Sequence, residues 1–390
     1  MIYADNAATT KMSRRAIDAM MPYMEKFYGN PSSLHSLGQE AAEALLSARE
    51  TVADCLGCSP KEIIFTSGGS EADNQAIISA AVNGAKKGKK HIISTAFEHH
   101  AVLHTLEKLK KQGFEIELLS VGSRGNITPE LVEKAIKDDT CLVTVMYANN
   151  EIGSVMPISE IGEVCRKHNV PFHTDAVQAV GHLHIDVNKQ NIDMLSLSAH
   201  KFHGPKGIGA LYCRQGILLT NIIEGGAQER GKRAGTENIP AIMGMAAALE
   251  EAENSIDKNT EKISALRDKL IDGLSQIPHS VLNGDREKRL PSNVNFCFEG
   301  IEGESLLLLL DDKGICASSG SACTSGSLDP SHVLLSIGLP HEIAHGSLRL
   351  SFSDENTLEE AKYILSVLPE IIERLRSMSP LWDKIKSEEK

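Results

Sequence analysis

The sequence has no long run of apolar residues and no excess of positive charge. Its longest leucine run spans only Leu306 to Leu310, whereas a helix needs about 20 consecutive apolar residues to cross a bilayer. Acidic residues outnumber basic ones by 52 to 40, which gives a formal net charge of -12. This balance argues against a general nucleic-acid or anionic-membrane surface. The first residues carry no basic segment followed by an apolar one, so we expect no signal peptide.

The cysteines also lack the spacing of a disulfide framework. The eight of them are spread along 390 residues, which favours reduced thiols in the cytosol. Cys55 and Cys58 have CxxC spacing, but no second pair follows at the distance of a zinc site, so we interpret them as structural thiols. We therefore expect a soluble cytoplasmic protein with no membrane and no nucleic-acid partner.

What the sequence does contain is a regular alternation of apolar runs and amphipathic helices. We expect strands at residues 63–66, 91–94, 115–120, 141–147, 171–174, 193–198 and 208–213. Such strands alternating with helices are typical of a parallel sheet covered on both faces. The fold class predicted is α/β, with a mainly parallel seven-stranded sheet flanked by helices.

The length of the chain predicts more than one domain. After the seventh strand we expect long helices at residues 239–256 and 260–277 that leave the sheet body, then strands at 294–298 and 347–352 and a terminal helix from 358. Residues 13–256 would form a large domain. Residues 1–12 and 257–390 would form a smaller α+β domain.

A lysine follows the strand expected at 193–198. Lys201 comes three residues after Ser198 and directly after His200. Serine and histidine can hydrogen-bond an anion beside an amine, an arrangement that suits a Schiff-base cofactor with a phosphate tail. A lysine in such a loop, taken alone, is more often an ordinary surface residue.

A carboxylate ends the strand before it. Asp175 at a strand end could hold the protonated nitrogen of a pyridine ring, and Gln178 could donate to a ring oxygen. In isolation Asp175 is better explained as a cap of the helix expected to follow it. Asp175 and Lys201 are separated by strand, helix and strand, which places both at the carboxyl ends of sheet strands, where open α/β sheets bind ligands. His99 follows another strand end and could stack on an aromatic cofactor or move a proton.

A glycine turn, a segment of small residues and an arginine complete the set of candidate site residues. Gly68, Gly69 and Ser70 follow a strand and begin a helix, so their N–H groups could form an anion cup, or only a capped turn. Cys323 lies among serines, glycines and alanines; it is either incidental or a thiol on a mobile arm. Arg349 lies in an expected strand, and a guanidinium can bind a carboxylate through two hydrogen bonds.

These motifs together resemble those of a known family, the cysteine desulfurases of the NifS/IscS type, which are fold-type I pyridoxal-phosphate enzymes of the class V aminotransferase group. The resemblance runs nearly end to end. The segments that carry it are YADNAATT (3–10), GNPSS (29–33), EH (98–99), NNEIG (149–153), SAHK (198–201), RAGTEN (233–238) and SGSACTS (319–325).

The resemblance implies a role for each matching residue. Lys201 would bind pyridoxal 5'-phosphate, with His99 over the ring and Cys323 as the sulfur-accepting nucleophile. The remaining cofactor-binding positions would be Gly69, Ser70, Asn150, Asp175, Gln178, Ser198, His200 and Thr236, the last reaching across from a partner subunit. Asn150 and Arg349 match the positions that bind the substrate carboxylate.

The resemblance also implies a reaction and partners. L-cysteine would become L-alanine, with its sulfur left on Cys323 as a persulfide for an iron–sulfur scaffold protein or another acceptor. Cys323 would then be able to ligate a cluster transiently with such a scaffold, and the enzyme would be a homodimer. Two other classes stay open: another pyridoxal-phosphate reaction, such as selenocysteine lysis or amine transfer, and a catalytically idle scaffold of the same fold.

Overall fold

The computed structural model describes residues 1–319 and 330–388, and its largest element is a seven-stranded sheet. Its strand order is β2-β8-β7-β6-β5-β3-β4. All pairs are parallel except those of β8, which runs antiparallel to both of its neighbours. The strands are β2 (Ile63–Thr66), β3 (His91–Thr95), β4 (Glu115–Leu119), β5 (Thr140–Thr144), β6 (Phe172–Asp175), β7 (Met194–Ser198) and β8 (Gly209–Cys213). The predicted fold class is confirmed.

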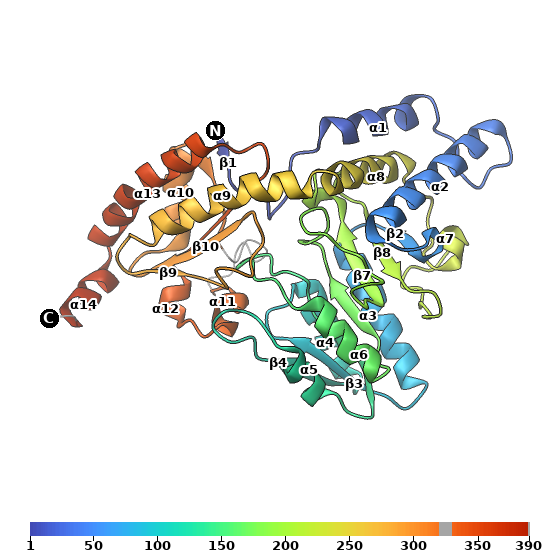
Figure 1. Cartoon of the computed structure of the whole chain (residues 1–390), viewed down its shortest axis with the longest axis horizontal. Coiled ribbons are helices and arrows are strands. Elements are labelled where there is room, and N and C mark those ends of the chain that lie inside the picture. The colour runs from blue at the N-terminus through green and yellow to red at the C-terminus, as the bar shows by residue number, and fades with distance from the viewer. Residues whose placement is uncertain (320–329, 389–390) are drawn as a thin grey trace.

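Helices cover both faces of this sheet (Figure 1). Because side chains alternate along a strand, Leu195 and Leu197 pack into one apolar cluster and Met194 into another. The Met194 face is covered by α3 (Gly69–Ala85) and α4 (His100–Lys111). The opposite face is covered by α2 (Ser36–Leu56), α5 (Pro129–Ala135), α6 (Ile158–Lys167) and α8 (Ile239–Glu253), with α1 (Arg14–Glu25) packed on α8.

The prediction that the helix at 239–256 leaves the sheet body is wrong. Helix α8 belongs to the large core, in which Ile242, Met245 and Leu249 are almost completely buried. It is apolar on nearly all sides because it lies between the sheet, α1 and α2. The following helix, α9 (Ile256–Leu274), does leave the large sheet and packs in a separate apolar cluster.

That second cluster surrounds a three-stranded antiparallel sheet of order β12-β10-β9. Its elements are β9 (Ser280–Leu282), β10 (Asn293–Phe298), β12 (Ser347–Ser351), α9, α10 (Gly303–Asp312) and α13 (Leu358–Ser377). The sheet lies within residues 257–390, where a smaller α+β domain is predicted, and the domain boundary itself stays a prediction.

The N-terminal residues cross between the two parts. Strand β1 (Ile2–Tyr3) pairs in parallel with β11 (Ile315–Cys316), and Figure 1 shows the N-terminus beside α10 and α13 before the chain runs to α1. The remaining short elements are η1 (Pro60–Glu62), η2 (Ala199–Lys201), α7 (Gln228–Gly231), α11 (His332–Ser336), α12 (His341–Ala344) and α14 (Pro380–Glu388).

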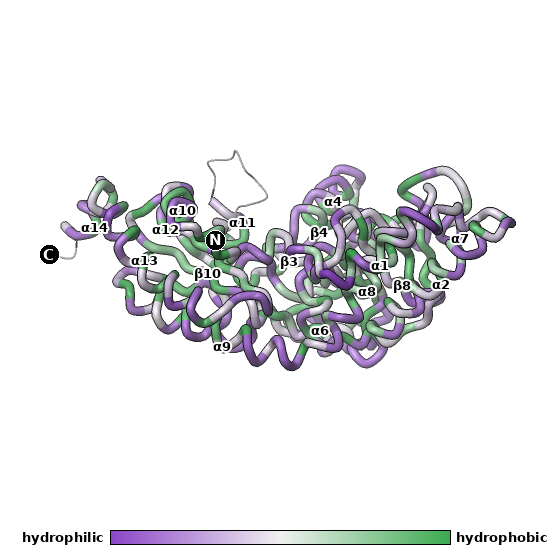
Figure 2. Tube along the Cα trace, turned by 90° about the horizontal axis from the view of Figure 1, so that it is seen from above, coloured by the Kyte–Doolittle hydropathy of each residue, from purple (hydrophilic) through white to green (hydrophobic). Residues whose placement is uncertain are grey.

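The hydropathy pattern follows this arrangement. In Figure 2 hydrophilic residues line the outer side of α9, while β10 and β8 are mostly hydrophobic. Within the two described ranges, no helix combines the length and apolarity needed to cross a membrane.

Candidate active site

Six of the seven strands of the large sheet, all except β8, end at one edge, which is where such sheets bind ligands. A cavity of about 350 Å³ lies at this edge. Ten of the twelve predicted site residues line it: Gly69, Ser70, His99, Asn150, Asp175, Gln178, Ser198, His200, Lys201 and Arg349. The sequence did not single out five further lining residues, Ala7, Ala8, Asp73, Met146 and Val177.

The turn before α3 is the segment for which an anion cup is predicted. Gly68 has a φ of 155°, and a Cβ on Gly69 would come within 2.5 Å of Val177 Cγ2, so neither position accommodates a larger residue without movement. Because Gly68 has no side chain to cap the helix, an anion can take that place at the positive end of the α3 dipole. The Ser198 hydroxyl lies next to this turn, 3.6 Å from the position of a Cβ on Gly68.

His200 and Lys201 follow β7 in the short helix η2. Burial and the Lys201 ammonium lower the pKa of His200 to about 4, so the ring is neutral at physiological pH and can donate one N–H to an anion. The Lys201 Nζ donates to two backbone carbonyls of the N-terminal segment, Ala7 O at 2.7 Å and Ala8 O at 2.8 Å. Gln178 Nε2 also donates to Ala7 O, at 3.0 Å.

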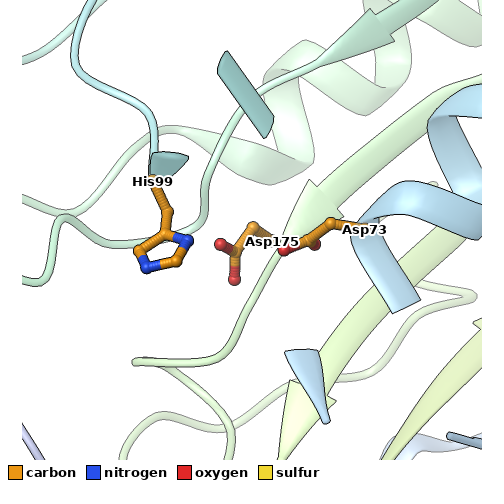
Figure 3. Close-up of side chains that lie close together, drawn as sticks. All are labelled: Asp73, His99 and Asp175. Atoms are coloured by element: carbon orange, nitrogen blue, oxygen red, sulfur yellow. The ribbon is translucent and has the colours of Figure 1, made fainter. Parts of the chain in front are cut away.

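A group of acidic and imidazole side chains lies beside the lysine. One ligand atom each from Asp73, His99 and Asp175 lies within 4.8 Å of the others (Figure 3). His99 caps α4 and accepts the Ala101 N–H on Nδ1 at 3.1 Å, so the neutral ring carries its proton on Nε2. Asp175 Oδ1 accepts the Val177 N–H at 3.0 Å. No helix lies between β6 and β7, so this carboxylate caps a turn, and the helix expected from the sequence to follow Asp175 is not present.

These carboxyl groups are unusually hard to ionise. Burial raises the pKa of Asp175, and the nearby His99 and Lys201 offset part of that effect. Burial, together with the Asp175 charge, raises the pKa of Asp73 well above its ordinary value. Glu98 is also completely buried, and its pKa rises to about 8 although Thr95 and the Met146 N–H hydrogen-bond to it. A cationic ligand bound at Asp175 would favour the ionised carboxylate and so lower the pKa of Asp175.

Arg349 reaches the cavity from β12 of the smaller sheet. It is 3% exposed, and its terminal nitrogens donate to Asn150 O and Asp5 Oδ1, both at 3.0 Å. Its Nε–H is buried, and the residues that the structure describes offer it no acceptor. Within residues 1–319 and 330–388, Arg349 therefore has one donor without a partner at the wall of the cavity, and such a donor suits a carboxylate.

Two predicted residues are not brought into the cavity. Thr236 is exposed and lies outside its lining. Cys323 lies outside the described residues, so its placement stays a prediction. The thiols of Cys55 and Cys58 are half-buried, and burial raises the pKa of each to about 12. Both thiols are therefore protonated at neutral pH, as expected of structural thiols.

The strand order of this α/β sheet, with a lysine and a buried aspartate at one edge, is typical of one class of enzyme. The chain belongs to the class-V aminotransferase family, which matches residues 2–364.

Relatives that match nearly the whole chain show which enzymes of this family it is similar to in sequence. The chain is 53% identical over 383 residues to cysteine desulfurase IscS of Methanosarcina thermophila, covering 98% of this chain and 95% of the relative. It is 54% identical over 385 residues to cysteine desulfurase IscS of Clostridium botulinum, covering 98% and 97%. The predicted NifS/IscS-type family is thereby confirmed.

Solved structures agree with this assignment. A NifS-like protein superposes with a TM-score of 0.90 at 38% identity, covering 96% of this chain and all of that one. SspA, solved in complex with cysteine, superposes with a TM-score of 0.81 at 38% identity, covering 92% and 100%.

Proposed function

We propose that the chain is a pyridoxal-phosphate-dependent cysteine desulfurase that converts L-cysteine to L-alanine and transfers the sulfur to Cys323. The observation that supports this most strongly is the convergence of Lys201, Asp175 and the anion cup on one cavity. The resemblance to cysteine desulfurases covers nearly the whole chain.

The donor set fits pyridoxal 5'-phosphate. Lys201 would hold the aldehyde carbon, and Asp175 would keep a proton on the ring nitrogen. The phosphate would be held by Gly69, Ser70, Ser198 and His200, with His99 over the ring, Gln178 at the ring oxygen and Asn150 at the cofactor edge. When bound, the cofactor supplies an electron sink for the substrate α-carbon.

The chain's own residues bind the substrate and move its protons. The Nε–H of Arg349, which has no acceptor in the part of the chain that the structure describes, would bind the carboxylate of L-cysteine together with Asn150 and so hold the α-carbon near Lys201. Lys201, in its unprotonated form, would move the α-proton. His99, with its proton on Nε2, would exchange a proton with Cys323 or with the departing sulfur.

Sulfur transfer requires the Cys323 thiolate, because the thiolate is the nucleophilic form. The C–S bond of the substrate breaks, an S–S bond forms to Cys323 Sγ, and the carbon that loses sulfur gains a proton to give L-alanine. The described residues on one side of the 320–329 segment contact Arg349 of the site, and those on the other side contact Glu151, the neighbour of Asn150. Ser318 pairs with Arg349 through backbone hydrogen bonds, and Ser331 donates to Glu151.

The proposal includes a homodimer in which Thr236 of one subunit completes the phosphate site of the other. Two observations support it. Thr236 is exposed and lies outside its own cavity, yet Arg233 links its loop to the start of α3 through Glu71, with Nε to Oε1 at 2.8 Å. Large apolar side chains are also exposed around α1 and α2, as expected of a surface that another subunit covers; they are Met21, Met24, Tyr28, Leu34 and Leu46.

The persulfide on Cys323 would pass to an iron–sulfur scaffold protein or another sulfur acceptor, and Cys323 would ligate a cluster transiently with such a scaffold. This part rests on the family resemblance. A reduced Cys323 thiol fits the cytoplasm, where thiols are kept reduced.

The test is turnover with L-cysteine. The purified enzyme with pyridoxal 5'-phosphate should release alanine and, without reductant, gain the mass of one sulfur atom on the Cys323 peptide. The Cys323→Ser variant should bind the cofactor normally but make neither alanine nor persulfide. Normal alanine formation by Cys323→Ser would contradict the persulfide step, and keto-acid formation from L-cysteine would indicate amine transfer instead.

A further inference from the structure

Asp5 and Arg349 form an ion pair at the wall of the cavity although 344 residues separate them in sequence. Asp5 Oδ1 lies 3.0 Å from a terminal nitrogen of Arg349. The Arg349 side chain is 3% exposed and that of Asp5 is 19% exposed. An ion pair this sheltered restricts the arginine more than a surface pair does, because solvent competes less for its donors.

The backbone around Asp5 is fixed to the strand that carries the arginine. Asp5 forms a parallel bridge with Ser351, two residues beyond Arg349. The Ala7 N–H donates to the Ser351 hydroxyl at 2.8 Å, and Asn6 Nδ2 donates to Ser351 O at 3.0 Å. The carboxylate of Asp5 therefore comes from a backbone segment whose position relative to β12 is set by several hydrogen bonds.

Two of the three guanidinium nitrogens of Arg349 have partners among the described residues. Of its five N–H donors, one terminal nitrogen donates to Asn150 O and the other to Asp5. The Nε–H stays without an acceptor among the described residues. Nε–H and a neighbouring terminal N–H form an edge that a carboxylate can bind through two parallel hydrogen bonds. Rotation of the guanidinium away from Asp5 would lose this alignment.

We propose that Asp5 is a positioning residue that orients Arg349 for the carboxylate of the substrate. The inference rests on the proposed function, because it takes Arg349 as the carboxylate-binding residue. Asp5 touches Arg349 and contributes no group to bond breaking. The same segment presents Ala7 O and Ala8 O to Lys201, so residues 5–8 contact both the amine and the guanidinium.

The experiment compares two substitutions in the cofactor-loaded enzyme. Asp5→Ala removes the acceptor that holds the terminal nitrogen, whereas Asp5→Asn keeps an oxygen in the same place. We expect Asp5→Ala to raise the KM for L-cysteine about tenfold or more with a much smaller change in kcat, since well-placed charge-assisted hydrogen bonds act mainly in binding here. Asp5→Asn should recover most of the wild-type KM.

Two ligands separate this role from a general structural one. Binding of 3-mercaptopropionate, which keeps the thiol and carboxylate but has no amine, should weaken in Asp5→Ala by a factor similar to that for KM, as measured by calorimetry. Binding of cysteamine, which keeps the thiol and amine but has no carboxylate, should not change. Cofactor binding and circular dichroism show whether each variant is folded and loaded.

Every outcome of these measurements either supports or overturns the proposed role of Asp5. Equal weakening for cysteamine and 3-mercaptopropionate would overturn the inference, as would an Asp5→Asn variant as impaired as Asp5→Ala, or unchanged KM in both. If Asp5→Ala does not fold, the affinity of Asp5→Asn for 3-mercaptopropionate is measured alone. An unchanged affinity supports the hydrogen-bonding role of Asp5, and a tenfold weaker affinity overturns that role. If the wild type turns over no L-cysteine and Arg349→Ala has no effect on 3-mercaptopropionate binding, the proposed function itself is wrong.

Discussion

The carboxylates of Asp73 and Asp175 come within 4.8 Å of each other although the two residues are only 1% and 5% exposed (Figure 3). Two buried carboxyl groups this close cannot both ionise without a compensating cation. Burial raises the pKa of Asp73 well above that of a free aspartate, and the charge of Asp175 raises it further. Asp175 also faces His99 and Lys201, which favour its ionised form. We therefore infer that Asp73 keeps its proton and Asp175 carries the negative charge.

This division of charge predicts different effects for two matched substitutions. Asp175→Asn should lower the rate of alanine formation by about 100-fold or more, because a group that holds a proton in place contributes this much. Asp73→Asn should retain most of the activity, because it exchanges a neutral acid for a neutral amide of similar shape. Steady-state kinetics of both variants, with cofactor content measured in parallel, test this. Equal losses in the two variants would show that Asp73 is also ionised.

The raised pKa of Glu98 predicts that the free energy of unfolding depends on pH. Its pKa is ordinarily near 4.5 and rises to about 8 in the folded chain, chiefly through burial. The folded state then holds a proton that the unfolded state has released, so the free energy of unfolding should fall between about pH 4.5 and pH 8, by about 1.4 kcal/mol per pH unit. Glu98→Gln cannot ionise and should remove this contribution.

Urea unfolding at pH 5 and pH 8 measures the effect. Relative to the wild type, Glu98→Gln should gain stability at pH 8 and little at pH 5. Glutamine keeps an oxygen to accept from Thr95 and the Met146 N–H. Glu117→Gln is a suitable control because Glu117 lies on the edge strand β4 and is partly exposed. An identical stability difference at the two pH values would show that Glu98 ionises normally in the folded chain.

A buried ion pair stabilises the loop that precedes Thr236. Both nitrogens at the end of Arg49 donate to Glu229 at 2.7 Å, and Glu229 also accepts the Phe65 N–H at 3.1 Å. Glu229 and Arg230 both adopt left-handed backbone angles, with φ of 48° and 59°, which is uncommon outside glycine. The ion pair therefore holds this strained turn against β2.

Removing one charge of the Arg49–Glu229 pair should destabilise the folded chain more than removing both charges. Glu229→Gln leaves the Arg49 cation buried without its partner and should destabilise the chain by about 3–5 kcal/mol. Adding Arg49→Met to that variant should recover part of the loss, because no lone charge is then buried. Chemical denaturation of the single and double variants tests this. A double variant less stable than Glu229→Gln would contradict it.

The central sheet was predictable because all of its strands except the edge strand β4 are buried along their length and so form nearly continuous apolar runs. All seven expected runs form strands. The lysine, the aspartate and the anion cup could be found because they follow such strands directly. Parallel strands bring those positions to a common edge.

Other features could not be found from local patterns. Asp5 and Arg349 pair across 344 residues, and no local pattern encodes that contact. Asp73 lies in the first turns of α3, three residues after Ser70, where an acidic residue is ordinarily explained by the helix dipole. Its burial comes from β6 and β7 packing against that helix. The helix that is α8 was assigned to the large domain but was expected to leave the sheet body, although its apolar residues on nearly all sides were a signal of burial.

The most direct test of the account is to find which residue forms the covalent link to the cofactor. The loaded wild-type enzyme should be reduced with borohydride, digested and analysed by mass spectrometry, with Lys201→Ala as the matched control. The account predicts a pyridoxyl phosphate group on the Lys201 peptide of the wild type and none on any peptide of the variant. A label on another lysine, or a wild type that takes up no label, would contradict it.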